Sequence, residues 1–167
     1  MPNSIFPRLQ WHEEQVLQTT QIPLTVQSWL FEKGSLTARL KQVCQQFDVK
    51  VQSEKWIEKI FENETALLPN KPYWCREVLL YGDNSQWVAA RTLISYELLK
   101  SHQNLLQLGT KPIGEWLFTQ ALQRQKIQWA FDYQTQYYAR RSLIFIQQVP
   151  LLISEIFLEQ SLFSEIN

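Results

Sequence analysis

Apolar and polar positions alternate most clearly over residues 73–81 (YWCREVLLY). β-Branched and aromatic residues are frequent there and no helix breaker interrupts the run, so the pattern predicts a strand. Because successive side chains of a strand point to opposite faces, one face carries four of these residues: Trp74, Arg76, Val78 and Leu80. Three of the four are apolar, so this face is predicted to point inward. A buried guanidinium is costly when unpaired, and Arg76 therefore requires an anionic partner.

Two short helices are predicted before this strand. Pro23 suits the first position of a helix that runs to about residue 31, and Gly34 ends it. Ser35 is a candidate N-cap for a second helix over residues 36–46, where apolar residues recur at helical spacing. The pair either packs on a sheet or forms a lid over a site, and the pattern alone does not choose between these.

Most of the chain after residue 46 is predicted to form strands. A cluster of turn residues at 82–85 joins the strand over 73–81 to a returning strand over 86–93 as an antiparallel hairpin. Pro112 can begin a short helix that runs through residue 118, and Pro150 marks a break before the last strand. The other predicted segments are an extended arm over 1–22, a strand over 49–56, a loop over 60–72, and strands over 122–132, 137–147 and 151–158. This order predicts an α+β fold with one sheet covered by helices.

Charged residues recur in the apolar rows of these strands. Arg91 lies in an apolar row of the strand over 86–93, and Glu155 in one of the strand over 151–158. Arg140 and Arg141 are adjacent, so they point to opposite faces of their strand. One interpretation is a buried arginine–glutamate ion pair, or side chains whose heads reach solvent. The other is a closed pocket for a small carboxylate anion, which the planar fork of arginine binds through two parallel hydrogen bonds.

Composition limits the choice of partners. The 167 residues are 45% hydrophobic and 19% charged, which suits one folded domain over residues 1–167. Sixteen basic and sixteen acidic residues cancel, so nothing electrostatic favours nucleic acid or an anionic membrane as a partner. The chain shows neither a signal-peptide pattern nor an apolar run of transmembrane length, and nothing demands a dimer. We therefore expect a cytoplasmic monomer without stable membrane association.

Several kinds of chemistry lack their motif in this chain. It has only four glycines, without a phosphate-binding loop or a dinucleotide fingerprint. His12 and His102 have no metal-ligand or catalytic-triad partner at a recognisable spacing, so we expect no metal site. Cys44 and Cys75 are too few and too far apart for a disulfide framework, and free thiols are typical of a reducing compartment.

The same residues resemble a known family, the bacterial chorismate pyruvate-lyases. Residues 108–114 (LGTKPIG) resemble its Leu-Gly-Lys-Thr-Pro-Leu-Gly segment, with threonine and lysine transposed. The likeness extends over nearly the whole chain, and the order and spacing of its short motifs are specific. The other stretches similar to the family are residues 67–69 followed by 73–80, then 90–92, 117–118, 140–142 and 150–158.

The resemblance implies a fold, an activity and a set of site residues. Its members have a single antiparallel sheet with helical flaps over a buried site. They convert chorismate to 4-hydroxybenzoate and pyruvate for ubiquinone synthesis, without a cofactor. The resemblance assigns the ring carboxylate to Arg76 and the ring hydroxyl to Glu155. It also places ligand contacts at Leu36 and Ile113, where the family usually has methionine and leucine.

Two parts of the mechanism and one alternative stay open at this stage. We predict that Arg91 binds the enolpyruvyl carboxylate or stabilises charge on the departing ether oxygen, while a role for Arg140 or Arg141 is undecided. The ring hydrogen passes either to Glu155 as a base or directly to the enolpyruvyl methylene. The alternative function is a non-catalytic effector domain of the same fold that binds a small aromatic acid. Such a domain should follow a DNA-binding winged helix, for which residues 1–22 are too short.

Overall fold

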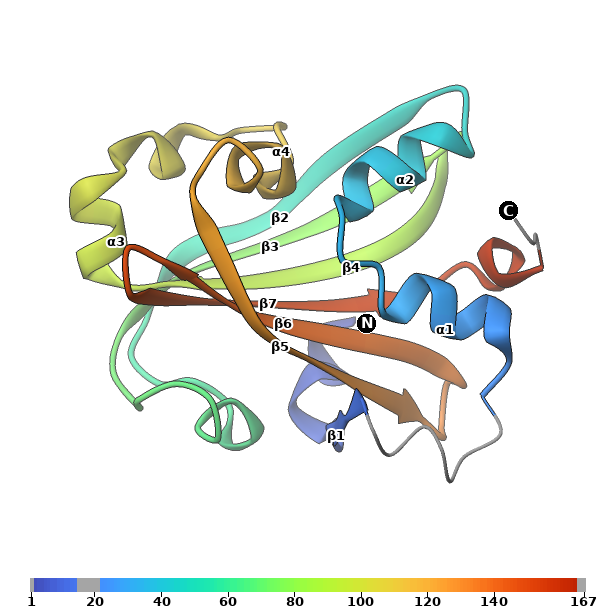
Figure 1. The fold of residues 1–167 in the computed structure, drawn as a ribbon, viewed down its shortest axis with the longest axis horizontal. Helices are drawn as coiled ribbons and strands as arrows, with labels where there is room; N and C mark the ends of the chain where they lie inside the picture. The colour runs from blue at the N-terminus through green and yellow to red at the C-terminus, as the bar shows by residue number, and fades with distance from the viewer. Residues whose placement is uncertain (1, 15–21, 165–167) are drawn as a thin grey trace.

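One antiparallel sheet organises the computed structural model, which describes residues 2–14 and 22–164 (Figure 1). In this part of the chain seven strands pair in the order β1-β5-β6-β7-β4-β3-β2. The strands are β1 (His12–Glu13), β2 (Phe47–Ile57), β3 (Tyr73–Gly82), β4 (Ser85–Ile94), β5 (Leu122–Asp132), β6 (Tyr137–Ile146) and β7 (Val149–Phe157). The α-helices are α1 (Leu24–Leu30), α2 (Leu36–Gln42), α3 (Tyr96–Ser101) and α4 (Ile113–Leu117). The 3-10 helices are η1 (Pro2–Ser4), η2 (Phe6–Arg8), η4 (Glu62–Glu64), η5 (Gln103–Gln107) and η6 (Gln160–Phe163).

The predicted α+β class and the single antiparallel sheet are confirmed. The predicted N-cap of α2 is also present, because Ser35 Oγ accepts a hydrogen bond of 3.0 Å from the Ala38 amide. The predicted hairpin turn between β3 and β4 has positive φ angles of 48° at Asp83 and 70° at Asn84. Both residue types tolerate this left-handed region, so the turn forms where the sequence indicates.

Other boundaries differ from the predictions. α2 ends at Gln42 rather than near residue 46. Pro150 does not break the chain but is the second residue of β7, paired with Phe145 at the hairpin end of the strand. The turn before it places Gln147 and Gln148 at positive φ, and two glutamines give no sequence signal for that conformation. The expected extended arm instead forms η1, η2 and β1, and its residues 15–21 lie outside the described residues.

The sheet is covered on both sides by different segments. On one side, the helix-covered face, α1 and α2 pack over residues such as Val78 and Ala90, while α3, η5 and α4 pack over Ile144 and Ile153. The N-terminal turns and the loop over residues 58–72 cover the other side, the loop-covered face. Figure 1 shows α1, α2 and α4 along one side of the sheet and the N-terminal segment on the other. Charged side chains of the central strands can therefore be buried on either face, as Arg76 and Arg91 are.

The helices in this fold are short. Among the described residues, none is long and apolar enough to cross a membrane. Their apolar residues instead pack on the sheet, as Leu30, Leu40, Leu98 and Leu117 do.

Candidate active site

Arg76 projects from β3 into a cavity between the helix-covered face and the helices. Its side chain is 2% exposed, and its Nη2 donates to the carbonyl oxygens of Gly109 at 2.8 Å and Lys111 at 2.9 Å. Nη1 lies 3.2 Å from Glu54 Oε2 on β2 but has no hydrogen-bond partner among the described residues. The segment before α4 therefore holds one end of the guanidinium, and a donor of Nη1 is left over.

Glu155 and Arg140 lie side by side on the helix-covered face of the sheet. They are register partners in β7 and β6, and Arg140 Nε donates to Glu155 Oε1 at 2.8 Å. Both are buried, and the Arg140 side chain reaches on to the carbonyl of Glu32, to which Nη1 donates at 2.9 Å. The contact is a charge-assisted hydrogen bond that uses one of the two carboxylate oxygens of Glu155.

Arg124 is a third arginine at this cavity, and no motif in the sequence marks it. Its Nη1 donates to the carbonyl oxygens of Lys33 at 2.9 Å and Glu32 at 3.2 Å, while its buried Nε has no hydrogen-bond partner among the described residues. Burial, and then the charge of nearby Arg140, lower the pKa of Arg124 below its ordinary value.

A β-bulge explains why simple alternation hides Arg124. The register of β5 shifts between Arg124 and Lys126, so that Arg124 pairs with Ile144 but Lys126 with Leu143. Strict alternation would place both cations on one face, whereas the extra residue turns Arg124 towards the helices. Ile144 packs in the helix-side cluster and Leu143 in the loop-side cluster, which is consistent with this switch.

The cavity brings together four of the five predicted site residues. Its volume is about 50 Å³. Leu36, the first residue of α2, and Ile113, the first residue of α4, line it from above. Gly114 follows Ile113, and a Cβ there would lie 3.2 Å from Thr37 Oγ1, so glycine allows α4 to approach α2 closely. The charged residues among those that line the cavity are Arg76, Arg124, Arg140 and Glu155.

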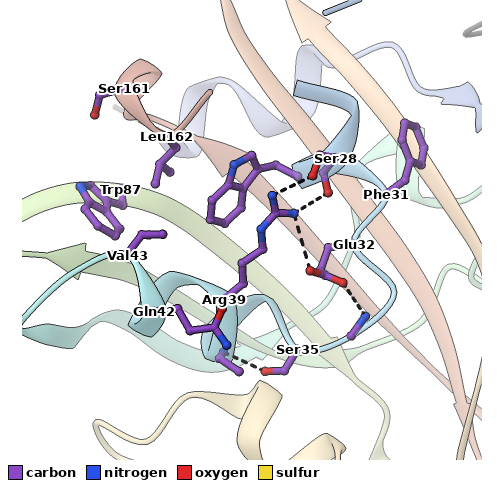
Figure 2. Close-up of a pocket in the computed structure, with 13 residues that line it drawn as sticks. Ser28, Phe31, Glu32, Ser35, Arg39, Gln42, Val43, Trp87, Ser161 and Leu162 are labelled. Carbon is purple, nitrogen blue, oxygen red and sulfur yellow. Dashed lines mark hydrogen bonds and ion pairs between the residues drawn. The ribbon is translucent and has the colours of Figure 1, made fainter. Parts of the chain in front are cut away.

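A larger groove of about 760 Å³ lies between α1 and α2, and Trp87 of β4 and η6 also line it (Figure 2). Figure 2 shows the Arg39 guanidinium pointing at Ser28, to whose carbonyl oxygen and Oγ it donates at 2.6 and 2.8 Å. The same guanidinium stacks 3.8 Å from the ring centre of Trp29. The groove and the cavity share Gly34 in their linings, so the connection between α1 and α2 separates them. Because the buried charges gather in the smaller cavity, we take that as the candidate active site.

Comparison with known proteins gives the family to which this architecture corresponds. The family model described as Chorismate lyase matches residues 5–167. The chain belongs to the chorismate lyase family. A probable chorismate pyruvate-lyase of Pasteurella multocida (strain Pm70) is 41% identical over 149 residues, which cover 87% of this chain and 88% of that protein. A probable chorismate pyruvate-lyase of Bartonella quintana (strain Toulouse) is 39% identical over 163 residues, or 95% of this chain and 92% of the relative.

A third relative extends the likeness. The chorismate pyruvate-lyase of Hamiltonella defensa subsp. Acyrthosiphon pisum (strain 5AT) is 36% identical over 162 residues, which cover 95% of this chain and 90% of that protein. The resemblance to chorismate lyases noted in the sequence is therefore confirmed across nearly the whole chain.

Arg91, the fifth residue expected at the chorismate lyase site, does not line the cavity. It lies on the loop-covered face, where Nε and Nη2 donate to the two carboxylate oxygens of Glu64 at 2.8 and 3.0 Å. Nη1 donates to Cys75 Sγ at 3.1 Å, and the guanidinium stacks 4.0 Å from the ring centre of Phe61. Burial disfavours its charge, but the Glu64 hydrogen bonds and neighbouring anionic groups outweigh burial and raise the pKa of Arg91. The sheet therefore separates Arg91 from Arg76, against the expected role at the substrate.

Arg141 also points to the loop-covered face, as its adjacency to Arg140 requires. Its Nε donates to Gln128 Oε1 and its Nη1 to the Asn63 carbonyl, both at 2.7 Å. Burial lowers the pKa of Arg141 to about 10. Arg140 is thus the member of the pair that lines the candidate cavity.

None of the described residues that line the cavity is a cysteine or a histidine. Both cysteines are free, and burial raises the pKa of Cys75 to about 12, which disfavours a nucleophilic thiolate. Across the described part of the chain, no group of three His, Cys, Asp or Glu residues is arranged to hold a metal ion.

Proposed function

We propose that this protein is a chorismate pyruvate-lyase that releases pyruvate from chorismate and forms 4-hydroxybenzoate, the first committed step of ubiquinone biosynthesis. The observation that carries the proposal is that Arg76 and Glu155 line one cavity from β3 and β7. A guanidinium suits a carboxylate, and a carboxylate accepts a hydrogen bond from a hydroxyl. The family membership and the names of the relatives support the same substrate.

The positions of Arg76 and Glu155 suit a ring with a carboxylate and a hydroxyl on opposite carbons. β4 lies between β3 and β7, so the backbones of the two residues are about two strand spacings, roughly 10 Å, apart across the sheet. Arg76 is opposite Thr92, whereas Glu155 is opposite Ala90, which also offsets the two along the strands. With both side chains reaching inward, the space between them suits the long axis of the ring. We assign the ring carboxylate to Arg76 and the ring hydroxyl to Glu155.

Leu36 and Ile113 close this arrangement from above. They begin α2 and α4, and both belong to segments tied to cavity arginines through backbone carbonyl oxygens. Because the open volume is only about 50 Å³, binding of the substrate requires these covering segments to shift outwards. Once closed again, they exclude water from the reacting ring.

The reaction breaks two bonds on neighbouring ring carbons. The bond from the ring to the ether oxygen breaks, the hydrogen of the hydroxyl-bearing carbon leaves, and the ring becomes aromatic. The released enolpyruvate gains a proton on its methylene carbon and becomes pyruvate. The proton travels through Glu155 as a base or directly to the methylene in a cyclic transfer. In either route the protein orients the dianion and stabilises charge on the departing oxygen.

The proposal extends to the setting of the reaction. We infer a single-domain monomer over residues 1–167 that acts in the cytoplasm. Two free cysteines support a reducing compartment.

A product assay tests the proposed function. The purified protein, treated with a chelator, is incubated with chorismate, and 4-hydroxybenzoate and pyruvate are measured in the same samples. We expect both products to appear in equal amounts at every time point. The proposal fails if neither product forms. If chorismate or 4-hydroxybenzoate then still raises the melting temperature, the result favours a non-catalytic effector-binding domain instead.

A further inference from the structure

Arg124 and Arg140 converge on one point at the edge of the cavity. The Nη1 atoms of both donate to the carbonyl oxygen of Glu32, at 3.2 and 2.9 Å, and Arg124 also donates to that of Lys33 at 2.9 Å. These carbonyl groups belong to the connection between α1 and α2. The carboxylate of Glu32 is engaged elsewhere, with the Gly34 amide at 3.0 Å and Arg39 at 3.6 Å. Two guanidinium groups thus meet backbone oxygens where a carboxylate would satisfy them better.

The charges of the cavity are unequally compensated. Arg76 has Glu54 as an ion-pair partner at 3.2 Å, and Arg140 has Glu155 at 2.8 Å. Among the described residues Arg124 has no carboxylate within ion-pairing distance, and its buried Nε makes no hydrogen bond. The Glu155 and Glu32 carboxylates act on the half-buried Arg124 only from beyond ion-pairing distance. A partly desolvated cation without a direct partner is costly, so this end of the cavity is suited to an additional anion.

The chemistry of chorismate places its second carboxylate at this end. If the ring carboxylate lies on Arg76 and the hydroxyl on Glu155, the enolpyruvyl ether occupies the carbon next to the hydroxyl-bearing one. Its carboxylate then projects from the Glu155 side of the ring. Arg140 is the register partner of Glu155, and Arg124 lies on β5, the next strand outwards. Arg140 therefore lies beside Glu155 on this side of the ring, and the Arg124 side chain reaches the same Glu32 carbonyl from Ile144's level in the sheet.

We propose that Arg124 and Arg140, rather than Arg91, form the subsite for the enolpyruvyl carboxylate of the substrate. The inference rests on the proposed function and deepens it. In the bound state the carboxylate oxygens replace the carbonyl oxygens of Glu32 and Lys33 as acceptors. The same two guanidinium groups then lie beside the departing ether oxygen and stabilise the enolate charge that develops there. Arg124 determines specificity, because the product 4-hydroxybenzoate has no group that would reach it.

The test compares two ligands that differ by this one carboxylate. In Arg124→Met we expect kcat/KM for chorismate to fall on the order of 10- to 100-fold, because a charge-assisted contact is lost. The dissociation constant of 4-hydroxybenzoate, measured by calorimetry, should change by less than about twofold, since the product lacks the second carboxylate. Arg124→Lys should recover part of the loss. Arg76→Met serves as the comparison and should weaken binding of both ligands.

Lys126→Met is the matched control. Lys126 is a cation on the same strand as Arg124, but it lies beyond the bulge and pairs with Glu13 at 3.4 Å. Its replacement should leave the kinetics for chorismate and the affinity for 4-hydroxybenzoate unchanged. If Arg124→Met proves unstable in thermal unfolding, Arg124→Gln is measured in its place.

The possible outcomes separate this inference from the proposed function. The inference is overturned if Arg124→Met weakens both ligands equally, or weakens neither. The proposed function, by contrast, is judged on the wild-type protein alone, through its release of pyruvate from chorismate. If the wild type releases none, calorimetric titration of chorismate and 4-hydroxybenzoate into wild type and Arg124→Met still decides the subsite. Selective loss of chorismate affinity supports it, and equal affinities contradict it.

Discussion

Arginines on the two faces of the sheet differ in how completely their hydrogen-bond donors are used. Arg91 and Arg141 donate hydrogen bonds to the loop that covers them. Arg91 donates to both carboxylate oxygens of Glu64, and Arg141 to the Asn63 carbonyl. Arg76 and Arg124 instead keep buried nitrogens without a hydrogen-bond partner among the described residues. An N–H donor without a protein partner beside a cavity is available to a ligand. A donor that already has a protein acceptor instead serves a structural contact.

Arg91 provides the clearest stability prediction at the residue scale. In Arg91→Met the buried Glu64 carboxylate loses its cation, and we expect the free energy of unfolding to fall by about 3–5 kcal/mol. Urea unfolding followed by tryptophan fluorescence measures this change. Below the denaturation midpoint, kcat for chorismate should stay close to the wild-type value.

A second substitution on the same pair provides the control. The double variant Arg91→Met/Glu64→Gln should recover much of the lost stability, because the charge left unpaired in the single variant is then absent. Glutamine keeps the oxygen that accepts from the Phe61 amide. A large fall in kcat for folded Arg91→Met would contradict a purely structural role for Arg91 and support a role in catalysis.

Glu155 is the residue on which the proton route depends. Glu155→Gln keeps an acceptor for the substrate hydroxyl but removes the base, so we expect kcat to fall on the order of 100-fold or more. The affinity for 4-hydroxybenzoate, measured by calorimetry, should change much less. Near-normal turnover would contradict the base role and favour direct transfer of the ring hydrogen to the enolpyruvyl methylene.

An ion pair joins the N-terminal segment to the sheet. Arg8, at the end of η2, donates from Nε and Nη2 to both carboxylate oxygens of Asp132 at 2.8 and 2.6 Å, which anchors the N-terminal segment to the end of β5. The Arg8 hydrogen bonds are the main cause that lowers the pKa of Asp132 to about 2, from an ordinary value of 3.8. Because the folded-state pKa is depressed, the stabilisation is complete above about pH 4 and is lost as the pH falls through 2.

This linkage gives a pH-dependent prediction at the element scale. Arg8→Met should lower the urea midpoint at pH 6, and the difference from wild type should shrink steadily as the pH falls from 4 to 2. Asp132→Asn should remove this part of the pH dependence, since its side chain does not titrate. A difference between wild type and Arg8→Met that stays constant down to pH 2 would contradict the assigned pair.

Elements were predictable where local chemistry decides them, and less so where a partner distant in sequence does. Ser35 and the turn at Asp83 and Asn84 carry their own signals, so α2 begins and the β3–β4 hairpin turns where the sequence indicates. The bulge in β5 carries none, and it reverses the face of Arg124. Alternation showed that Arg91 is buried, but both faces of this sheet are covered, so burial alone could not show which one it occupies.

At the scale of the whole molecule, the sheet separates the hydrogen-bonded Arg91–Glu64 ion pair from the candidate active site. The loop-covered face holds Arg91, Arg141 and Glu64 in satisfied contacts, while the helix-covered face holds the cavity with Arg76 and Glu155. The resemblance to the family assigns site roles to the last two and to Leu36 and Ile113, and all four line this one cavity. The sequence could not supply the long-range contacts, such as Arg140 with the Glu32 carbonyl, because nothing local relates residues 108 positions apart.

The position of the ligand tests the central claim most directly. A crystal structure of the protein with 4-hydroxybenzoate would show where an aromatic acid binds. We predict the ligand in the cavity beneath α2 and α4, with its carboxylate on Arg76 and its hydroxyl on Glu155. A ligand held instead in the larger groove beside Arg39 and Trp29, with the cavity closed, would contradict the account.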